Sequence, residues 1–264
     1  MQSAPKVFIT GASSGIGSAL ARQYAKQGAF LGLAARSGDQ LQALAETLSS
    51  AGATRVHCYP LDVTDAVALR SAAEDFIARL GVPDIVIANA GVSGGTLTEF
   101  ADDLELIRRI LEINVYGMAA TFSPFIAAMR QNAKAGKAGR LVGMASVAGI
   151  RGLPGAEAYS ASKAAAITYL ESLRLELRSS GVKVVAIVPG YIETPMTAVN
   201  PYRMPFLLPA DEAARRFARA IERGTSYTVI PWQMGVVAKL LRLLPNALYD
   251  RLFANAPRKP RSVG

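Results

Sequence analysis

The sequence predicts an α/β fold in which a doubly wound, mainly parallel sheet of seven strands carries helices on both faces. Two features of the 264 residues lead to this class. Short apolar runs alternate with helix-length amphipathic segments, as they do where helices join parallel strands. Several runs are apolar throughout, as strands covered on both sides require. No repeat or linker interrupts the alternation, so we expect residues 1–264 to form a single domain.

Seven segments are the strand candidates. In chain order they are residues 6–10, 30–35, 55–60, 84–89, 140–145, 183–188 and 226–230. Intervening segments such as 18–28 and 164–177 have the length and apolar spacing of helices. With 51% hydrophobic residues, the chain has ample apolar surface to bury such a sheet.

Composition excludes several classes of protein. The single Cys58 excludes an intramolecular disulfide framework, and with the single His57 it cannot form a His/Cys cluster, so we expect no metal. The first residues lack the layout of a signal peptide, and no run approaches about 18 uninterrupted apolar residues. We therefore expect a cytoplasmic protein that does not span a membrane. The net charge of +9 is scattered over the chain without a basic, aromatic-interleaved stripe, so no nucleic-acid partner is expected.

A glycine-rich turn, TGASSGIG at residues 10–17, joins the first strand candidate to a helix. Glycines at such a turn let the backbone approach a pyrophosphate, and the helix amino terminus offers N–H donors and partial positive charge. The spacing Gly-x-x-x-Gly-x-Gly differs from the Gly-x-Gly-x-x-Gly fingerprint of dinucleotide sites. An ordinary tight turn is the alternative, but the flanking strand and helix favour a dinucleotide.

Arg36 and Ser37 follow the second strand candidate, where a dinucleotide site distinguishes a ribose hydroxyl from a 2′-phosphate. An acid there favours NAD, whereas an arginine accommodates the phosphate through its charge and planar set of donors. The rival acid, Asp39, is better placed to begin the next helix. The sequence therefore favours NADP(H), with a merely surface-exposed Arg36 as the alternative.

The pentapeptide YSASK, residues 159–163, places a phenol and an ammonium group one helical turn apart. With about 3.6 residues per turn, Tyr159 and Lys163 project from the same face of a helix. A phenol with a pKa of about 10 exchanges protons poorly near neutrality unless a nearby cation stabilises its anion. The same spacing also suits a surface helix whose tyrosine packs on a lysine stem, so the context must decide.

An ordered set of motifs supplies that context. They are TGASSGIG, LDV at 61–63, ANAG at 88–91, Asn114 in INVYG, Ser146 in ASVAG, YSASK and VPG at 188–190. On this set, running from residue 10 to about residue 194, the chain resembles the short-chain dehydrogenase/reductase family. Ala88 stands where that family often has a second asparagine, a small departure that leaves a strand-end role for Asn89 plausible.

The resemblance implies a Rossmann-type fold and four catalytic residues. Tyr159 would exchange a proton with the substrate oxygen, and Lys163 would lower the pKa of Tyr159 and hold the nicotinamide ribose. Ser146 would hydrogen-bond the same oxygen, unless it only caps a turn. Asn114 would interrupt its helix and hold a water that completes a proton relay through Lys163, unless it is a solvated helix residue.

The resemblance also implies the cofactor contacts. They are Gly11, Ser13, Ser14, Gly15, Ile16 and Gly17 at the pyrophosphate; Arg36 and Ser37 at the 2′-phosphate; Asp62 and Val63 at the adenine; Asn89, Ala90 and Gly91 on the adenosine side; Tyr159 and Lys163; and Pro189, Gly190, Ile192 and Thr194 at the nicotinamide. The implied reaction is hydride transfer between NADP(H) and a carbonyl or secondary alcohol. An NAD-linked dehydrogenase and a non-catalytic dinucleotide-binding regulator are the alternatives.

Two segments depart from the simple alternation. Residues 190–208 are rich in proline and large apolar side chains, so we predict an irregular substrate lid. Its apolar residues suit a lipophilic substrate, unless they pack on the helix expected near Pro209; they are Tyr191, Met196, Tyr202, Met204, Phe206, Leu207 and Leu208. Residues 234–264 predict two short helices separated by Pro245 and then a frayed basic tail at 256–264. Packing within a subunit, or between subunits of a homodimer or homotetramer, is favoured for this extension over peripheral membrane contact.

Overall fold

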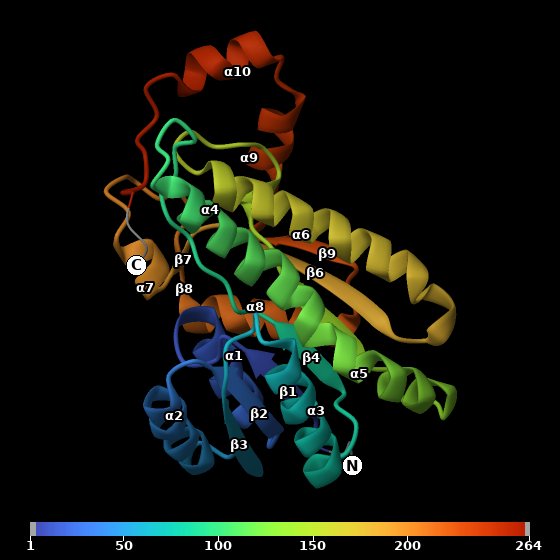
Figure 1. The fold of residues 1–264 in the computed structure, drawn as a ribbon. Helices are drawn as coiled ribbons and strands as arrows, with labels where there is room; N and C mark the ends of the chain where they lie inside the picture. Colours follow the sequence, from blue (N-terminus) through green and yellow to red (C-terminus); the bar gives the residue numbers. More distant parts are fainter. Residues whose placement is uncertain (1–3, 262–264) are drawn as a thin grey trace.

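The predicted sheet is present in a computed structural model, which describes residues 4–261. All seven strand candidates form strands: β1 (Lys6–Thr10), β2 (Phe30–Ala35), β3 (Arg55–Pro60), β4 (Ile85–Ala88), β5 (Arg140–Met144), β6 (Lys183–Pro189) and β9 (Tyr227–Ile230). They pair in the order β3-β2-β1-β4-β5-β6-β9, and every pairing is parallel (Figure 1). The predicted doubly wound α/β fold is thereby confirmed.

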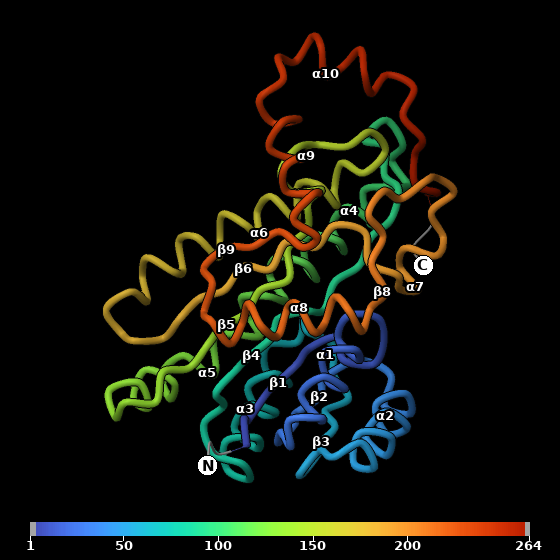
Figure 2. The backbone as a smooth tube through the Cα atoms, turned by 180° about the vertical axis from the view of Figure 1, so that it is seen from behind, coloured from blue at the N-terminus to red at the C-terminus, as the bar shows by residue number. Residues whose placement is uncertain are grey.

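Helices cover both faces of this sheet. One face carries α1 (Gly15–Ala25), α2 (Gly38–Ser50) and α8 (Ala210–Arg223), and the other carries α3 (Ala66–Leu80), α5 (Gly117–Lys134) and α6 (Glu157–Glu176). Side chains alternate along each strand, so Ile9 packs into the core under α1 and α8 while Phe8 packs into the core under α3 and α5. Figure 2 shows α1 and α8 on the side facing the viewer.

The strand order reverses at β1, and this reversal positions the site. From β1 the chain moves outward first to β2 and β3, and then crosses back to β4 on the other side of β1. The loops that leave the carboxyl ends of β1 and β4 therefore diverge. In open α/β sheets this divergence makes a crevice at the carboxyl edge, where ligands bind.

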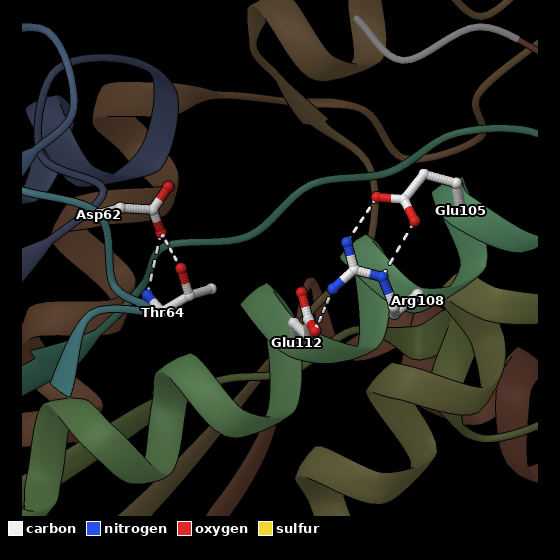
Figure 3. A network of polar contacts seen from close by, with 5 residues as sticks. All are labelled: Asp62, Thr64, Glu105, Arg108 and Glu112. Carbon is white, nitrogen blue, oxygen red and sulfur yellow. Dashed lines mark hydrogen bonds and ion pairs between the residues drawn. The ribbon is translucent and has the colours of Figure 1, made fainter.

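A long helical run precedes β5 and is interrupted once. It consists of α4 (Asp103–Leu111), a π-helical turn η1 (Glu112–Tyr116) and α5. On its exposed side Arg108 bonds both Glu105 and Glu112 and so bridges α4 to the π turn (Figure 3). Within the described chain this is the one helix whose length and apolar composition would suit a membrane span. Phe122 and Phe125, however, are fully buried against the sheet, as in a core helix.

The segment predicted as an irregular lid contains regular structure, so that part of the prediction is wrong. It forms the two-residue strands β7 (Ile192–Glu193) and β8 (Leu208–Pro209), which pair in parallel, and the short helix α7 (Pro195–Ala198). Proline suits the first helical position, and the side chains of Thr194 and Thr197 cap each other's backbone amides. The helix expected near Pro209 begins at Ala210.

The carboxyl-terminal extension contains the two predicted helices, α9 (Trp232–Leu243) and α10 (Asn246–Phe253), on either side of Pro245. The described part of the tail is docked, so the prediction of fraying is wrong for residues 256–261, which we call the C-terminal strap; residues 262–264 lie outside the described chain. The Pro260 carbonyl accepts a bond of 2.9 Å from the Gly95 amide, and Arg261 pairs with the buried Asp103 at 2.9 Å. In Figures 1 and 2 the strap returns from α10 to lie beside α7.

Candidate active site

A cavity of about 520 Å³ lies at the carboxyl ends of the central strands. This volume lies in the range of small-molecule and cofactor sites. The structure brings to its wall every residue that the sequence assigned to catalysis or to the cofactor, with the exceptions of Gly17 and Asn114. These two lie immediately behind the wall and have structural contacts described below.

The glycine turn after β1 is shaped by two close backbone approaches. Gly11 has a φ of +64°, and a Cβ atom there would lie 2.7 Å from the Ala90 Cα atom. A Cβ atom on Gly17 would collide with the Gly11 carbonyl oxygen, which explains why Gly17 supports the turn rather than lining the cavity. Ser14 precedes α1 in an extended conformation and makes no side-chain cap bond. The amides of the first turn of α1 thus have no side-chain cap, which suits an anion at this helix end.

Asn89 fastens this turn to the end of β4. Its side-chain amide donates to the carbonyl oxygens of Thr10 at 3.1 Å and Gly11 at 3.0 Å. The residue still lines the cavity, beside Ala90 and Gly91. The side-chain nitrogen of Asn89 thus joins the loop after β4 to the glycine turn after β1. Asn89 therefore helps to shape the part of the cavity that was predicted to hold the adenosine, and it also lines that part.

Arg36 is exposed on the cavity wall at the end of β2. Within residues 4–261 it forms no ion pair, so its guanidinium is available to a ligand. Ser37 begins α2, and its hydroxyl accepts a long bond of 3.4 Å from the Gln40 amide. The rival acid Asp39 lies in the first turn of α2, as predicted, and is not part of the cavity wall.

Asp62 holds the loop that follows β3. One of its carboxylate oxygens accepts from both the amide and the hydroxyl of Thr64, at 2.9 and 2.8 Å (Figure 3). These bonds hold in place the part of the cavity wall that Asp62 and the buried Val63 form, which was predicted to contact the adenine.

Tyr159 and Ser146 lie next to each other on the cavity wall. Burial raises the pKa of Tyr159, and a hydrogen bond with Ser146 opposes that rise. The Ser146 hydroxyl also accepts from the Ala148 amide at 3.2 Å and begins the 3₁₀ turn η2 (Val147–Gly149). Ser146 therefore caps the turn, as in the alternative interpretation, and it also lies on the cavity wall next to the phenol, where its hydrogen bond to a substrate oxygen stays a prediction.

Lys163 lies behind Tyr159 and donates to the Met144 carbonyl oxygen at 2.9 Å. Its ammonium nitrogen is 5.8 Å from the centroid of the Tyr159 ring. Burial lowers the pKa of Lys163 to about 8. The expectation that Lys163 lowers the pKa of Tyr159 needs correction, because burial is the largest influence on both groups and pushes each toward its neutral form.

Asn114 lies in the π turn between α4 and α5, so the predicted interruption of its helix is confirmed. Its side chain accepts from the Val92 amide at 2.8 Å and donates to the Val92 carbonyl at 3.0 Å and the Ser162 hydroxyl at 2.9 Å. With 1% of its surface exposed, Asn114 is not the solvated residue of the alternative interpretation. It links the loop after β4 to α6, the helix that carries Tyr159 and Lys163.

Several cavity residues were not predicted. They are Ala35, Gln40, Leu61, Val92, Ile113, Met144, Ala145, Pro195 and Thr197. Most are immediate chain neighbours of a predicted residue, and Gln40 lies one helical turn after Arg36. Proximity in the sequence could have found them, but their residue types carry no chemical signal of their own.

The C-terminal strap and the lid meet beside the cavity. The Lys259 ammonium donates to the Ser93 hydroxyl at 3.1 Å and to the Met196 carbonyl at 3.3 Å, and burial lowers its pKa. Met196 lines the cavity, as expected of a lid residue, whereas Phe206 is 49% exposed and lies outside its wall. The strap therefore joins the loop after β4 to the lid, next to Val92 on the cavity wall.

Comparisons with known proteins agree with this arrangement. A family model described as short chain dehydrogenase matches residues 5–203. An "uncharacterized oxidoreductase" of Myxococcus xanthus (strain DK1622) is 43% identical over 243 residues, which are 92% of this chain and 94% of the relative. An "11-beta-hydroxysteroid dehydrogenase-like 3" of Arabidopsis thaliana is 35% identical over 230 residues, covering 85% of this chain and 72% of the relative.

Solved structures share the fold over most of the chain. An alcohol dehydrogenase from the archaeon Thermococcus sibiricus, solved in complex with 5-hydroxy-NADP, superposes with a TM-score of 0.75 at 26% identity. The match covers 86% of this chain and 95% of that structure.

Proposed function

The chain belongs to the short-chain dehydrogenase/reductase family, and from this membership we propose that it is an NADP(H)-dependent oxidoreductase acting on a lipophilic carbonyl or secondary alcohol. Oxidoreduction between CH–OH and C=O groups is the chemistry of the family. The choice of cofactor and reaction rests on one cavity that Tyr159 and Ser146 line at one end and Arg36 at the other. Arg36 is exposed and forms no ion pair with an acid of residues 4–261.

The residues present fit a nicotinamide dinucleotide. Any side chain at Gly11 or Gly17 would fill the space next to the turn, and the amino terminus of α1 offers uncapped amides to a pyrophosphate. Arg36 would hold the 2′-phosphate through charge-assisted hydrogen bonds, which favours NADP over NAD. When bound, the nicotinamide supplies the hydride equivalent, and the protein aligns the reactants and handles the proton.

Tyr159 is the proposed proton donor in reduction and proton acceptor in oxidation, through its Oη atom. Ser146 would donate a hydrogen bond to the same substrate oxygen and stabilise the negative charge that develops there. Lys163, fixed to the Met144 carbonyl, would hold the nicotinamide ribose. Asn114 would keep the loop after β4 and α6 in register, and the predicted water of the relay remains part of this proposal.

A lipophilic substrate is proposed from the apolar lid residue Met196 and from the names of relatives such as the Arabidopsis protein. A small-molecule substrate, a homodimer or homotetramer and a cytoplasmic location stay predictions.

The test is a panel of carbonyl compounds and alcohols, assayed by nicotinamide absorbance with NADPH or NADH and their oxidised forms. We expect turnover of apolar ketones or alcohols with the phosphorylated cofactor. Equal affinity for NADPH and NADH would favour the NAD-linked alternative, and tight cofactor binding without turnover of any compound would favour a regulatory dinucleotide-binding protein.

A further inference from the structure

Helix α9 exposes an apolar stripe that no part of the described chain covers. Trp232, Val236, Leu240 and Leu243 follow one another at helical spacing and are 68, 47, 60 and 80% exposed. The opposite side of the same helix is also apolar and buries Met234 and Ala238. A helix that is apolar on both sides is ordinarily covered on both.

Another helix of the same molecule shows the usual pattern. Helix α8 buries Phe217 and Ile221 against the sheet and carries charged residues such as Arg215 and Glu212 on its outer side. The outer side of α9 is therefore a local feature of the extension. Helix α10 also exposes apolar side chains, Leu248 and Leu252, which lie one turn apart and are 45 and 61% exposed.

The two helices are held rigidly from their inner side. Arg151 donates to the Leu244 carbonyl at 2.7 Å and to the Asn246 side chain at 3.0 Å. Its guanidinium lies 3.9 Å from the centroid of the Tyr249 ring, and the Tyr249 hydroxyl donates to the Gly152 carbonyl at 2.6 Å. These contacts fix the extension to the loop that follows Ser146 and η2, so α9 and α10 lie next to the segment that carries Ser146.

The charges beside the apolar face are predominantly positive. Lys239, Arg242 and Arg251 are exposed, and none forms an ion pair with any part of residues 4–261. Between residues 232 and 261 the only acid is Asp250.

This charge distribution decides between two partners. In a symmetric contact with a second copy, the same patch would face itself and bring these cations together without matching acids. A bilayer surface with anionic headgroups supplies the missing negative charge, and its acyl boundary covers the apolar side chains. We propose that α9 and α10, which lie next to the segment that carries Ser146, form a docking face for an anionic membrane surface.

Trp232 provides a direct test, because it is the only tryptophan of the chain and lies at one end of the stripe. The intact protein is mixed with vesicles of phosphatidylcholine alone or with phosphatidylglycerol, and binding is followed by flotation and by tryptophan fluorescence. We expect binding to the anionic vesicles, weakened by salt, with a blue shift of Trp232 emission and quenching by brominated lipid. Failure to bind either vesicle at low salt would overturn the proposal.

Matched variants separate the apolar and the charged contributions. Leu240→Ser/Leu243→Ser should lower the vesicle partition coefficient by at least about tenfold, because two exposed leucines lose their acyl contact. Lys239→Glu/Arg242→Glu should remove the preference for phosphatidylglycerol, with a loss of roughly tenfold or more. Val67→Ser/Leu175→Ser and Lys26→Glu/Lys137→Glu change equally exposed residues elsewhere and should bind as the wild type does.

The competing partner gives a different result. If a second copy covers the face, the wild type sediments as an oligomer that Leu240→Ser/Leu243→Ser dissociates, and vesicles bind neither protein. That outcome would overturn the membrane proposal, as would vesicle binding that the leucine variant leaves unchanged. Both are read without substrate, so failure of the membrane proposal is distinct from failure of the proposed redox activity.

Discussion

The Lys163 ammonium nitrogen donates a hydrogen bond to the Met144 carbonyl oxygen at the end of β5, 2.9 Å away. Met144 lies two residues before Ser146. The bond therefore joins α6, which carries Lys163, to the strand whose following loop carries Ser146. Ser146, Tyr159 and Lys163 are therefore held by one strand end and one helix. Burial, which lowers the pKa of Lys163 to about 8, leaves its charge sensitive to what occupies the cavity.

The buried Lys163 should make stability depend on pH. Its pKa in the folded protein is about 8, against an ordinary value of 10.5. Between pH 8 and pH 10.5 Lys163 is protonated in the unfolded chain and largely neutral in the folded chain. The contribution of Lys163 to the free energy of unfolding therefore rises as the pH rises through this range, and it is lost as the pH falls. Relative to Lys163→Met, the free energy of unfolding of the wild type should rise by roughly 3 kcal/mol from pH 8 to pH 10.5.

Urea denaturation of both proteins at a series of pH values measures this difference. Because burial raises the pKa of Tyr159, its effect has the opposite sign and begins near pH 10, where the unfolded tyrosine ionises. Placing both proteins in a Tyr159→Phe background removes it. Parallel pH profiles for the two proteins would contradict a lowered pKa of Lys163.

Removing the Tyr159 hydroxyl should abolish proton transfer but not cofactor binding. General acid–base groups contribute about 10²- to 10⁴-fold to rate, so Tyr159→Phe should lower kcat by that order. The dissociation constant of NADPH, measured by fluorescence titration, should change little. Undiminished turnover would exclude Tyr159 as the proton donor.

Arg36 should determine the choice between the two nicotinamide cofactors. Its loss in Arg36→Leu removes charge-assisted hydrogen bonds to a 2′-phosphate, so NADPH should bind about 10- to 100-fold more weakly. The affinity for NADH should change by much less, because NADH has no such phosphate. Calorimetric titration of both cofactors checks this, with Arg70→Leu on α3 as a control outside the cavity. Equal losses for both cofactors would assign Arg36 another role.

Replacing Asn114 should destabilise the protein as well as impair it. Asn114→Ala leaves the partly buried amide and carbonyl of Val92, and the buried Ser162 hydroxyl, without the partner they have in the wild type. Unsatisfied buried groups cost about 1–3 kcal/mol each, so a loss of roughly 2–4 kcal/mol in the free energy of unfolding is expected. Thermal and urea denaturation measure it. Wild-type stability in the variant would show that water replaces these bonds without cost.

The C-terminal strap should detach when Gly95 gains a side chain. A Cβ atom there would lie 2.7 Å from the Pro260 carbonyl oxygen and closer still to that of Lys259. In Gly95→Val, trypsin should therefore cleave after Arg258 faster than in the wild type. Gly152→Ala is the control, because a Cβ atom at Gly152 meets nothing within 4 Å. Equal cleavage rates in all three proteins would show that the strap does not depend on this contact.

The fold and much of the cavity wall were predictable because their signals are local. Runs such as residues 183–188 are apolar throughout, and parallel pairing places their carboxyl ends, with the glycine turn and Arg36, along one edge. Regular structure in the lid was missed because it depends on long-range pairing, as between Ile192 and Leu208, which the proline content obscures.

Other features depend on contacts distant in the sequence. Docking of the strap requires Arg261 to find Asp103, a pairing for which neither residue carries a sequence signal. The pKa of Tyr159 was misjudged because the helical spacing reveals the nearby cation but not the depth of burial, which has the larger effect.

The pairing of Arg261 with Asp103 has a consequence for biosynthesis. The glycine turn and the strands on either side of β1 belong to the first part of the chain to be synthesised. The contacts of the strap with Gly95, Asp103 and Met196 require residues 259–261 to have left the ribosome. The wall beside the lid is therefore completed after the glycine turn has been synthesised, once residues 259–261 have emerged.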